Sequence, residues 1–510
     1  MAGVSNLTLG PRWIVAGVVL AAICGALVLT SGGWLSPIAK REILSALSRQ
    51  YRSDIDIQSL DLSFLPHPRA TGVGLVLREK DHPGIPPLIT MQRFEADASW
   101  FGLLISPHRI RNLRLEGLEI HIARGQPVTE SHTPGRQPAP LLVFEEIVAD
   151  GTRLEVLPQS QDKPPLQFDI YKLSMTGAGI DRPMHYQAQL RNAKPPGIID
   201  ATGDFGPWNA RDPRETAVTG KYRFSNADLA VFKGISGRLS SNGEFHGRLD
   251  KIEVSGETDT PDFEVSVGGH LLHLRTNFSA TVDGTNGDTL LHPVNAHFGH
   301  TTVVAQGEIS GEEGVRGKTI LLDATVQDGE IADVLRLGVK SEPPPMNGRI
   351  RFHAKIRIPP GAGDIPDRME LHGQFEIVGG RFTNPALEQK LSTISERTRG
   401  KTEGPVESAS SDFNGGFVLR EGLLTLTGFA FHIPGATVRL DGTYGLKSEE
   451  LNFHGTVATE VRLSQMTTGV KSLLLKMVDP IFSKNRAGAV IPIHIGGTRS
   501  APKFGLSIGR

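Results

Sequence analysis

Residues 349–358 read RIRFHAKIRI, in which every second residue is apolar. The apolar positions are Ile350, Phe352, Ala354, Ile356 and Ile358, and the positions between them hold arginine, histidine or lysine. Successive side chains of an extended strand point to opposite faces, so this stretch predicts a strand with one apolar face and one basic face. Strands that are buried on both faces lack such alternation, so the basic face is expected to contact water.

The same alternation begins near residue 53 and continues for more than three hundred residues. Further examples lie at residues 55–57, 60–64, 73–77, 118–122, 263–267, 278–282 and 491–495. Turn sequences such as DGTNGD at 283–288 separate the alternating segments. At about five to six residues per strand the region holds roughly two dozen strands, so the predicted fold class is mainly β.

Three stretches have the spacing of helices instead. They lie at residues 35–51, 384–399 and 462–482, where apolar residues recur every three or four positions. Asn384 followed by Pro385 is typical of a helix start, and Pro480 of a helix end. We therefore expect a few short helices near the ends of the molecule.

Residues 13–29, WIVAGVVLAAICGALVL, carry no charge. At 1.5 Å per residue a helix of this length crosses most of a hydrocarbon core of roughly 30 Å. We predict a transmembrane anchor at 13–31 after a cytoplasmic tail at 1–12, with a cleaved signal peptide as the alternative. The residues assigned to the anchor are Trp13, Ile14, Val18, Leu20, Ile23, Leu27 and Leu29. Arg12 precedes the run whereas Lys40 and Arg41 follow it, and this charge distribution leaves the membrane orientation open.

Composition narrows the classes of function. The chain has 54 Lys and Arg against 55 Asp and Glu, which argues against nucleic acid as the main partner. Its single cysteine, Cys24, excludes a disulfide within the chain.

Residues that could carry out chemistry are sparse. His292, His297 and His300 lie close together in the sequence, but no carboxylate or cysteine joins them, and on a strand His297 would point away from the other two. The sequence has no phosphate-binding glycine loop and no nucleophile motif. We therefore predict no catalytic residue, no metal and no cofactor, and a protein that is not an enzyme.

The apolar faces of so many one-sided strands need a cover. Together they present more than about 1,000 Å², whereas soluble monomers leave only a few hundred Å² of contiguous apolar surface exposed. A second sheet, helices or hydrocarbon held in an open trough could each cover them, and the alternation does not choose among these. The residues predicted to line this surface, as a trough or as the core of a closed sandwich, are Leu424, Leu426, Phe429, Phe431, Ile433, Val438, Leu440, Ile491, Ile493 and Ile495.

Both ends of the chain resemble the AsmA-like envelope proteins of Gram-negative bacteria. The N-terminal likeness rests on the predicted anchor and helix, on YRSDIDIQSLDLSFLPHPRATGVGLVLRE at 51–79, and on PPLITMQRFEADASWFGLLISPHRIRNLRLEGLEIHIAR at 86–124. The C-terminal likeness rests on FNGGFVLREGLLTLTGFAFHIPGATVRLDGTYGLKSEELNFHGTV at 413–457 and on GAVIPIHIGGTRSAPKFGLSIG at 488–509. Each motif is weak alone, but their order is more specific.

This resemblance implies a long twisted, largely antiparallel sheet curled into a hydrophobic groove. It divides the chain into an AsmA-like N-terminal region at 32–150, a central β-strand region at 151–345 and an AsmA-like C-terminal region at 346–510. It also implies a single-pass inner-membrane protein with most of its chain in the periplasm.

The function that the resemblance implies is transport of phospholipids between the inner and outer membranes, with a role in outer-membrane lipid homeostasis. The expected partners are the inner membrane, phospholipid acyl chains, and the outer membrane or other envelope proteins. The alternative from another class is a non-enzymatic envelope assembly factor that affects outer-membrane protein biogenesis.

Overall fold

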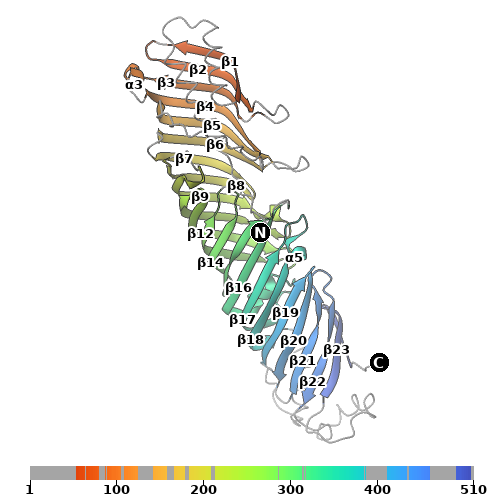
Figure 1. Cartoon of the computed structure of the whole chain (residues 1–510). Helices are drawn as coiled ribbons and strands as arrows, with labels where there is room; N and C mark the ends of the chain where they lie inside the picture. Colours follow the sequence, from red (N-terminus) through yellow and green to blue (C-terminus); the bar gives the residue numbers. More distant parts are fainter. Residues whose placement is uncertain are drawn as a thin grey trace, which may run out of the picture. The chain divides into compact units, whose positions relative to one another are not determined.

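The computed structural model describes most of the chain from residue 53 onward. The described residues are 53–63, 65–79, 87, 89–104, 108–123, 142–157, 166–178, 183–207, 213–284, 286–312, 315, 317–383, 385, 411–433, 436–459 and 490–506. Backbone hydrogen bonds join the 24 described strands in one sheet, which confirms the mainly β fold class (Figure 1).

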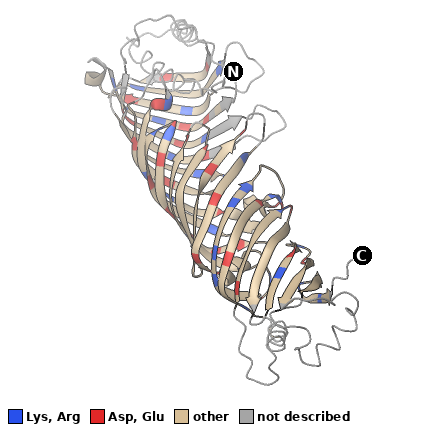
Figure 2. Cartoon of the chain, turned by 60° about the horizontal axis from the view of Figure 1, so that its bottom comes forward, with Lys and Arg blue, Asp and Glu red and all other residues tan. Residues whose placement is uncertain are grey.

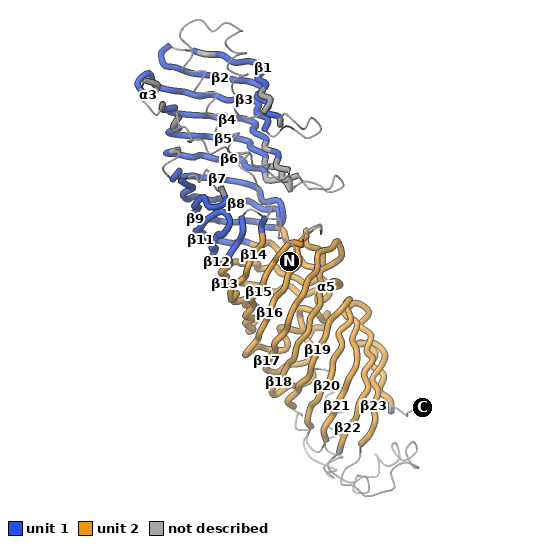
Figure 3. Tube along the Cα trace, in the orientation of Figure 1, with its two compact units in different colours: residues 1–227, 240–256, 281–287 blue, residues 228–239, 257–280, 288–510 orange. Residues whose placement is uncertain are grey.

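The described residues fall into two compact units (Figure 3). Unit 1 takes those within Met1–Ala227, Ser240–Gly256 and Thr281–Gly287, and unit 2 takes those within Asp228–Leu239, Glu257–Ala280 and Asp288–Arg510. Four strands have residues in both units, namely β9 (Ala217–Asp228), β11 (Arg238–Arg248), β12 (Lys251–Val265) and β13 (Leu271–Val282).

Unit 1 contains all or most of eleven elements and η1. They are β1 (Ser53–Ser63), β2 (Arg69–Glu79), β3 (Ile89–Ala98), α3 (Trp100–Leu104), β4 (His108–Ala123), β5 (Leu142–Leu157), β6 (Leu166–Ala178), β7 (Met184–Ala193), β8 (Pro196–Phe205), η1 (Pro213–Glu215), β9 (Ala217–Asp228) and β11 (Arg238–Arg248).

Unit 2 contains the remaining elements. They are η2 (Leu229–Phe232), β10 (Ile235–Ser236), β13 (Leu271–Val282), β14 (Thr289–Phe298), β15 (Thr301–Gly311), β16 (Lys318–Glu330), α4 (Ile331–Arg336), β17 (Met346–Ile358), α5 (Ile365–Arg368), β18 (Glu370–Phe382), β19 (Ser411–Arg420), β20 (Leu423–Ile433), β21 (Ala436–Gly445), β22 (Leu451–Thr459), β23 (Val490–Thr498) and β24 (Ala501–Leu506).

Strands pair mainly with their neighbours in the sequence. In unit 1 each strand from β1 to β9 pairs with the next, and in unit 2 each strand from β14 to β24 does so. In these two runs the ladders are antiparallel except between β4 and β5, which run parallel with Leu113 opposite Ile147. The described sheet is therefore largely antiparallel, as predicted.

The alternation of the sequence sets the two faces of each strand. In β17, Ile350 and Ala354 are buried and Phe352 is half-buried, whereas Arg351 and His353 between them are exposed. In β7, half-buried and exposed residues likewise alternate over most of the strand. Each Å² of apolar surface removed from water stabilises the fold by about 25 cal/mol, so the apolar side chains decide which face turns away from solvent.

The short helix α4 packs on β16 and β17 at one end of their apolar face. Asp333 in this helix is only 2% exposed, and it accepts hydrogen bonds from the His300 backbone N–H (2.7 Å) and the Thr301 hydroxyl (3.1 Å). A buried carboxylate needs such donors, and here they come from the turn before β15 and from the first residue of β15. Asp333 thereby fixes the helix to that turn.

Several sequence predictions concern residues outside the described ranges. These are the tail at 1–12, the anchor at 13–31, the helices at 35–51 and 462–482, and nearly all of the helix at 384–399. Among the described residues, none of the helices has the length and apolar character needed to cross a membrane. The region boundaries at 150 and 345, which came from resemblance, stay predictions.

Replacing Phe413 by alanine should test where the core of unit 2 lies. Phe413 is 1% exposed and belongs to its buried cluster, so Phe413→Ala is expected to lower the free energy of unfolding by about 3–5 kcal/mol. Leu423→Ala, at a residue that is 46% exposed, is the control and should cost about 1 kcal/mol at most. Thermal unfolding followed by circular dichroism measures both, and equal losses would contradict this placement of the core.

Candidate functional site

The register between neighbouring strands aligns apolar side chains of unit 2 in rows that cross the strands. In the first row each residue lies opposite the next one along. It comprises Ile350, Ile377, Phe413, Phe431, Val438, Val457 and Ile491, from β17 to β23. All but Ile491 are buried, so the first row is the packed core of unit 2.

Two further rows run beside the first and are more open. The second row comprises Val326, Phe352, Phe375, Gly415, Phe429, Leu440, Gly455 and Ile493. The third row comprises Ala354, Gly373, Phe417, Leu426, Gly442, Phe453 and Ile495. Most of their large side chains are only half-buried, including Phe352, Phe375 and Ile493. We call these two rows the open apolar face of unit 2.

The structure brings most of the predicted lining residues together in these rows. The first row holds Phe431, Val438 and Ile491, the second Phe429, Leu440 and Ile493, and the third Leu426 and Ile495. Leu424 is half-buried and lies on β20 two residues before Leu426, opposite Tyr444. The Ile433 backbone pairs with Ala436, but its side chain lies outside the described part of the chain.

A register shift in β20 keeps its predicted lining residues on one face, although Leu426 and Phe429 are three residues apart and would otherwise point to opposite faces. The register shifts between Leu426 and Phe429, and Gly428 there has a φ of 58°. A β-bulge places one extra residue in one strand, so side chains on either side of it can share a face. Glycine suits this position because it adopts positive φ without steric strain.

Phenylalanine rings pack between the first and second rows. The ring centroids of Phe413 and Phe431 are 4.9 Å apart, and Phe413 stacks on Phe429 at 5.8 Å. Phe375 lies 6.1 Å from Phe429. Such pairs contribute about 0.5–1.5 kcal/mol beyond the burial of their area. The aromatic cluster therefore joins the core of unit 2 to its open apolar face.

Glycines allow several rings to lie along the sheet. A Cβ atom added to Gly373 would come within 2.8 Å of Phe417 Cζ, and one added to Gly442 within 2.6 Å of Phe453 Cδ1. In unit 1 a Cβ atom on Gly220 would lie 2.6 Å from Tyr186 Oη. A side chain at these positions would displace the ring, so the glycines allow the rings to lie flat against the sheet.

Unit 1 has an apolar face of the same kind across β7, β8 and β9. Its cross-strand rows are Tyr186 with Gly203 and Gly220, Ala188 with Ala201 and Tyr222, and Leu190 with Ile199 and Phe224, and all are half-buried. Burial, with a smaller contribution from Asp204, raises the pKa of Tyr186 to about 12. Burial also raises the pKa of Tyr222, against the opposing effect of its 3.1 Å hydrogen bond with Ser241. Both phenols therefore stay neutral at physiological pH.

The opposite, polar face carries charges that pair across strands. Figure 2 shows both signs interspersed along the sheet. Four of the basic residues predicted for β17 pair with acids of β16 and β18: Arg349 with Asp328, His353 with Asp323 (2.7 Å), Arg351 with Glu376 (3.5 Å) and Arg357 with Glu370 (3.4 Å). Such exposed pairs contribute little stability, about 0–1 kcal/mol each. Their effect is to balance the positive charge of the basic face that the sequence predicts for β17.

On β12 and β13 of unit 2 the same kind of pairing shifts a titration. The His273 side chain hydrogen bonds with Asp259 at 2.6 Å, and this bond is the main cause of the lowered pKa of Asp259. Partial desolvation opposes the shift, and Arg275 adds to it. The carboxylate thus stays ionised on the polar face.

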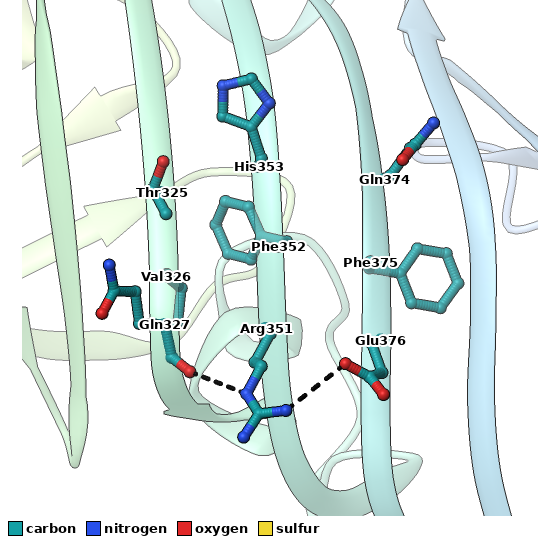
Figure 4. Close-up of a pocket in the computed structure, with 9 residues that line it drawn as sticks. All are labelled: Thr325, Val326, Gln327, Arg351, Phe352, His353, Gln374, Phe375 and Glu376. Carbon is teal, nitrogen blue, oxygen red and sulfur yellow. Dashed lines mark hydrogen bonds and ion pairs between the residues drawn. The ribbon is translucent and has the colours of Figure 1, made fainter.

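A pocket of about 620 Å³ lies against three adjacent strands of unit 2 (Figure 4). Each strand contributes three consecutive residues, namely Thr325, Val326 and Gln327, Arg351, Phe352 and His353, and Gln374, Phe375 and Glu376. The Arg351 guanidinium donates to the Gln327 carbonyl oxygen at 3.2 Å and to Glu376 Oε2 at 3.5 Å. Arg351 is therefore held by the protein's own acceptors.

No three His, Cys, Asp or Glu residues within the described ranges come together as a group that could hold a metal ion. Of the histidines considered from the sequence, His297 contacts the Thr302 hydroxyl at 2.8 Å, and the His300 backbone N–H donates to Asp333.

Sequence reasoning did not assign Phe375, Phe413, Phe417 or Phe453 to the candidate site. The alternation in LHGQFEI at 371–377 was visible, and it places Phe375 on the apolar face. What could not be seen was the register, which puts Phe375 opposite Phe352 and Phe413 opposite Phe431.

Substituting Gly442 should test the close packing of the third row. A Cβ atom there would lie 2.3 Å from the Asn452 carbonyl oxygen, which is backbone and cannot move aside easily. Gly442→Ala is therefore expected to lower the free energy of unfolding by about 1–3 kcal/mol. The matched variant Gly505→Ala, where nothing lies within 4 Å, should leave stability unchanged or raise it. Denaturant unfolding compares them, and a neutral Gly442→Ala would refute the packing described.

In comparisons with known proteins, no family model, no curated protein and no solved structure matches this chain.

Proposed function

We propose that this chain is a non-enzymatic, inner-membrane-anchored periplasmic protein that carries phospholipids between the inner and outer membranes. The observation that carries the proposal is the open apolar face of unit 2, where most of the large side chains are half-buried and the opposite face of the sheet is exposed and charged. The AsmA-like motifs at both ends of the sequence support the same function, as well as the anchor at 13–31.

The energy of exposing lipid tails sets what such a carrier must do. Each methylene that leaves hydrocarbon for water costs about 0.8 kcal/mol, so a phospholipid with some thirty of them faces roughly 25 kcal/mol. An apolar protein surface offsets much of this cost without any covalent chemistry. In the proposed arrangement the sheet curls into a groove that holds the acyl chains, and the head group stays in water.

The second row is long enough for this task. It crosses the strands from Val326 on β16 to Ile493 on β23. At about 4.8 Å per strand these seven steps cover roughly 34 Å. One lipid tail occupies about 15 Å, half of a hydrocarbon core of about 30 Å. A tail lying along the row would therefore have room to move from strand to strand.

Photo-crosslinking in cells should tell the two faces apart. Benzoylphenylalanine in place of Phe352 or Ile493 is expected to capture phospholipid, because both side chains lie on the open apolar face. The matched controls are His353 and His494, the next residues on the same strands, which are exposed on the polar face. Lipid adducts at equal yield from both pairs would contradict the proposal, and so would adducts to protein alone. Capture of unfolded outer-membrane proteins would instead favour the assembly-factor alternative.

A charge on the open apolar face should abolish lipid binding without unfolding the chain. Phe352→Asp is expected to reduce the phospholipid recovered with the purified protein at least tenfold, equivalent to about 1.4 kcal/mol. Because Phe352 is half-buried, the aspartate can reach solvent and the thermal midpoint should fall only slightly. Phe431→Asp, at a residue that is 6% exposed, should unfold unit 2. Unchanged lipid recovery in a folded Phe352→Asp protein would count against the proposal.

A further inference from the structure

Large apolar side chains are exposed together at one edge of unit 1. Leu65, in the turn between β1 and β2, is 83% exposed, and Trp100 and Phe101 in α3 are 49% and 73% exposed. The pairing of Ser63 with Arg69 and of Arg69 with Asp97 puts the end of β1, the start of β2 and the end of β3 at the same edge. In Figure 1 the arrowhead of β1 and helix α3 accordingly lie on the same side. We call Leu65, Trp100 and Phe101 the edge patch.

The turn that carries Leu65 is fixed to β3. The Ala98 backbone N–H donates to the Pro68 carbonyl oxygen at 2.9 Å. Arg69 pairs with Asp97 at 2.6 Å, and His67 lies 3.4 Å from the same carboxylate. These contacts hold the turn in a defined position beside the end of β3.

Helix α3 is fixed in a comparable way. The Ser99 hydroxyl accepts a hydrogen bond from the Gly102 N–H at 2.9 Å. Gly102 is buried, and a Cβ atom there would come within 2.9 Å of the Arg109 carbonyl oxygen on β4. The backbone of α3 thus packs directly on β4, and this contact turns Trp100 and Phe101 outward.

We propose that the edge patch inserts into the interfacial region of a phospholipid bilayer. Tryptophan has an apolar body with a polar N–H and concentrates at membrane interfaces, while phenylalanine and leucine gain from contact with the acyl chains below. Arg109 and Arg111 are exposed at the start of β4, beside α3, where they can meet lipid phosphates.

The chain itself points to a bilayer as the occupant. The uncharged run that ends at Leu29 is separated from β1 by the 23 residues 30–52. At 3.3–3.6 Å per residue this connection spans at most roughly 80 Å. The start of β1 therefore lies within roughly 80 Å of any bilayer that the run enters. The inference rests on the proposed function for that anchor, and it adds a second contact through which the sheet itself would meet the membrane.

The experiment uses the full chain reconstituted in vesicles of phosphatidylcholine and phosphatidylglycerol. Cys24→Ala removes the single native cysteine, so Phe101→Cys can carry one environment-sensitive NBD label. The expected result is a blue-shifted emission that nitroxide-labelled lipids quench severalfold. The control is Leu271→Cys, at a residue 69% exposed in unit 2, whose label should emit as in water and resist quenching.

The proposal is overturned if the label at Phe101→Cys emits as in water. This holds whether the protein binds the vesicles or fails to bind them. A blue shift that nitroxide lipids do not quench also overturns it, because a second copy or another protein would then cover the patch. As a further measurement, Trp100→Ser with Phe101→Ser should abolish quenching of a label at Leu65→Cys while leaving the thermal midpoint unchanged. If nitroxide lipids still quench the label at Leu65→Cys in this double variant, the result counts against insertion of the edge patch.

The groove and the patch can fail separately. Lipid captured from Phe352 together with an unquenched label at Phe101 would retain the proposed function and reject the edge patch. Quenching at Phe101 without lipid at Phe352 would retain the patch as a membrane contact and reject lipid carriage.

Discussion

The architecture depends on one constraint. Each strand has one apolar and one polar face, and the apolar faces must be shielded from water although the described strands form a single sheet. Most strands meet their backbone hydrogen-bonding needs through their neighbours, so within the described residues the apolar face of unit 2 is covered mainly by its own side chains and, at one end, by α4. In unit 2 that cover is nearly complete along the first row, where Phe413 is 1% exposed, and incomplete along the second, where Phe352 is half-buried. The graded burial separates residues that form the core of unit 2 from residues that stay partly accessible on its surface.

Register and residue size work together to maintain this arrangement. The bulge at Gly428 returns Phe429 and Phe431 to the face that Leu426 occupies, so the rows continue across β20. Glycines opposite aromatic residues let the rings pack along the sheet, and this packing buries part of each ring. On the polar face, acids of β16 and β18 balance the bases of β17, so that neither sign accumulates. Each device is local, and each acts between adjacent strands.

How much could be predicted from the sequence follows from this local character. Period-two alternation identified the strands, the mainly β class and the exposed side of β17, because the face to which each side chain points is determined within a single strand. It also placed Phe431, Val438 and Leu440 in the apolar cluster. It could not pair Phe413 with Phe431, because register depends on loops and on partner strands. The parallel pairing of β4 with β5 and the pairing of Arg351 with Glu376 escaped prediction for the same reason.

Pairing between sequence neighbours has a consequence for how such a chain can change in length. Where each strand contacts only the strands beside it, stability is close to a sum of neighbour terms, as in repeat proteins. Adding or deleting one antiparallel hairpin between β14 and β24 would therefore leave the remaining ladders intact and shift the total length by about 10 Å. Within unit 2 the hairpin, rather than the whole unit, is therefore the smallest part by which the sheet can lengthen or shorten.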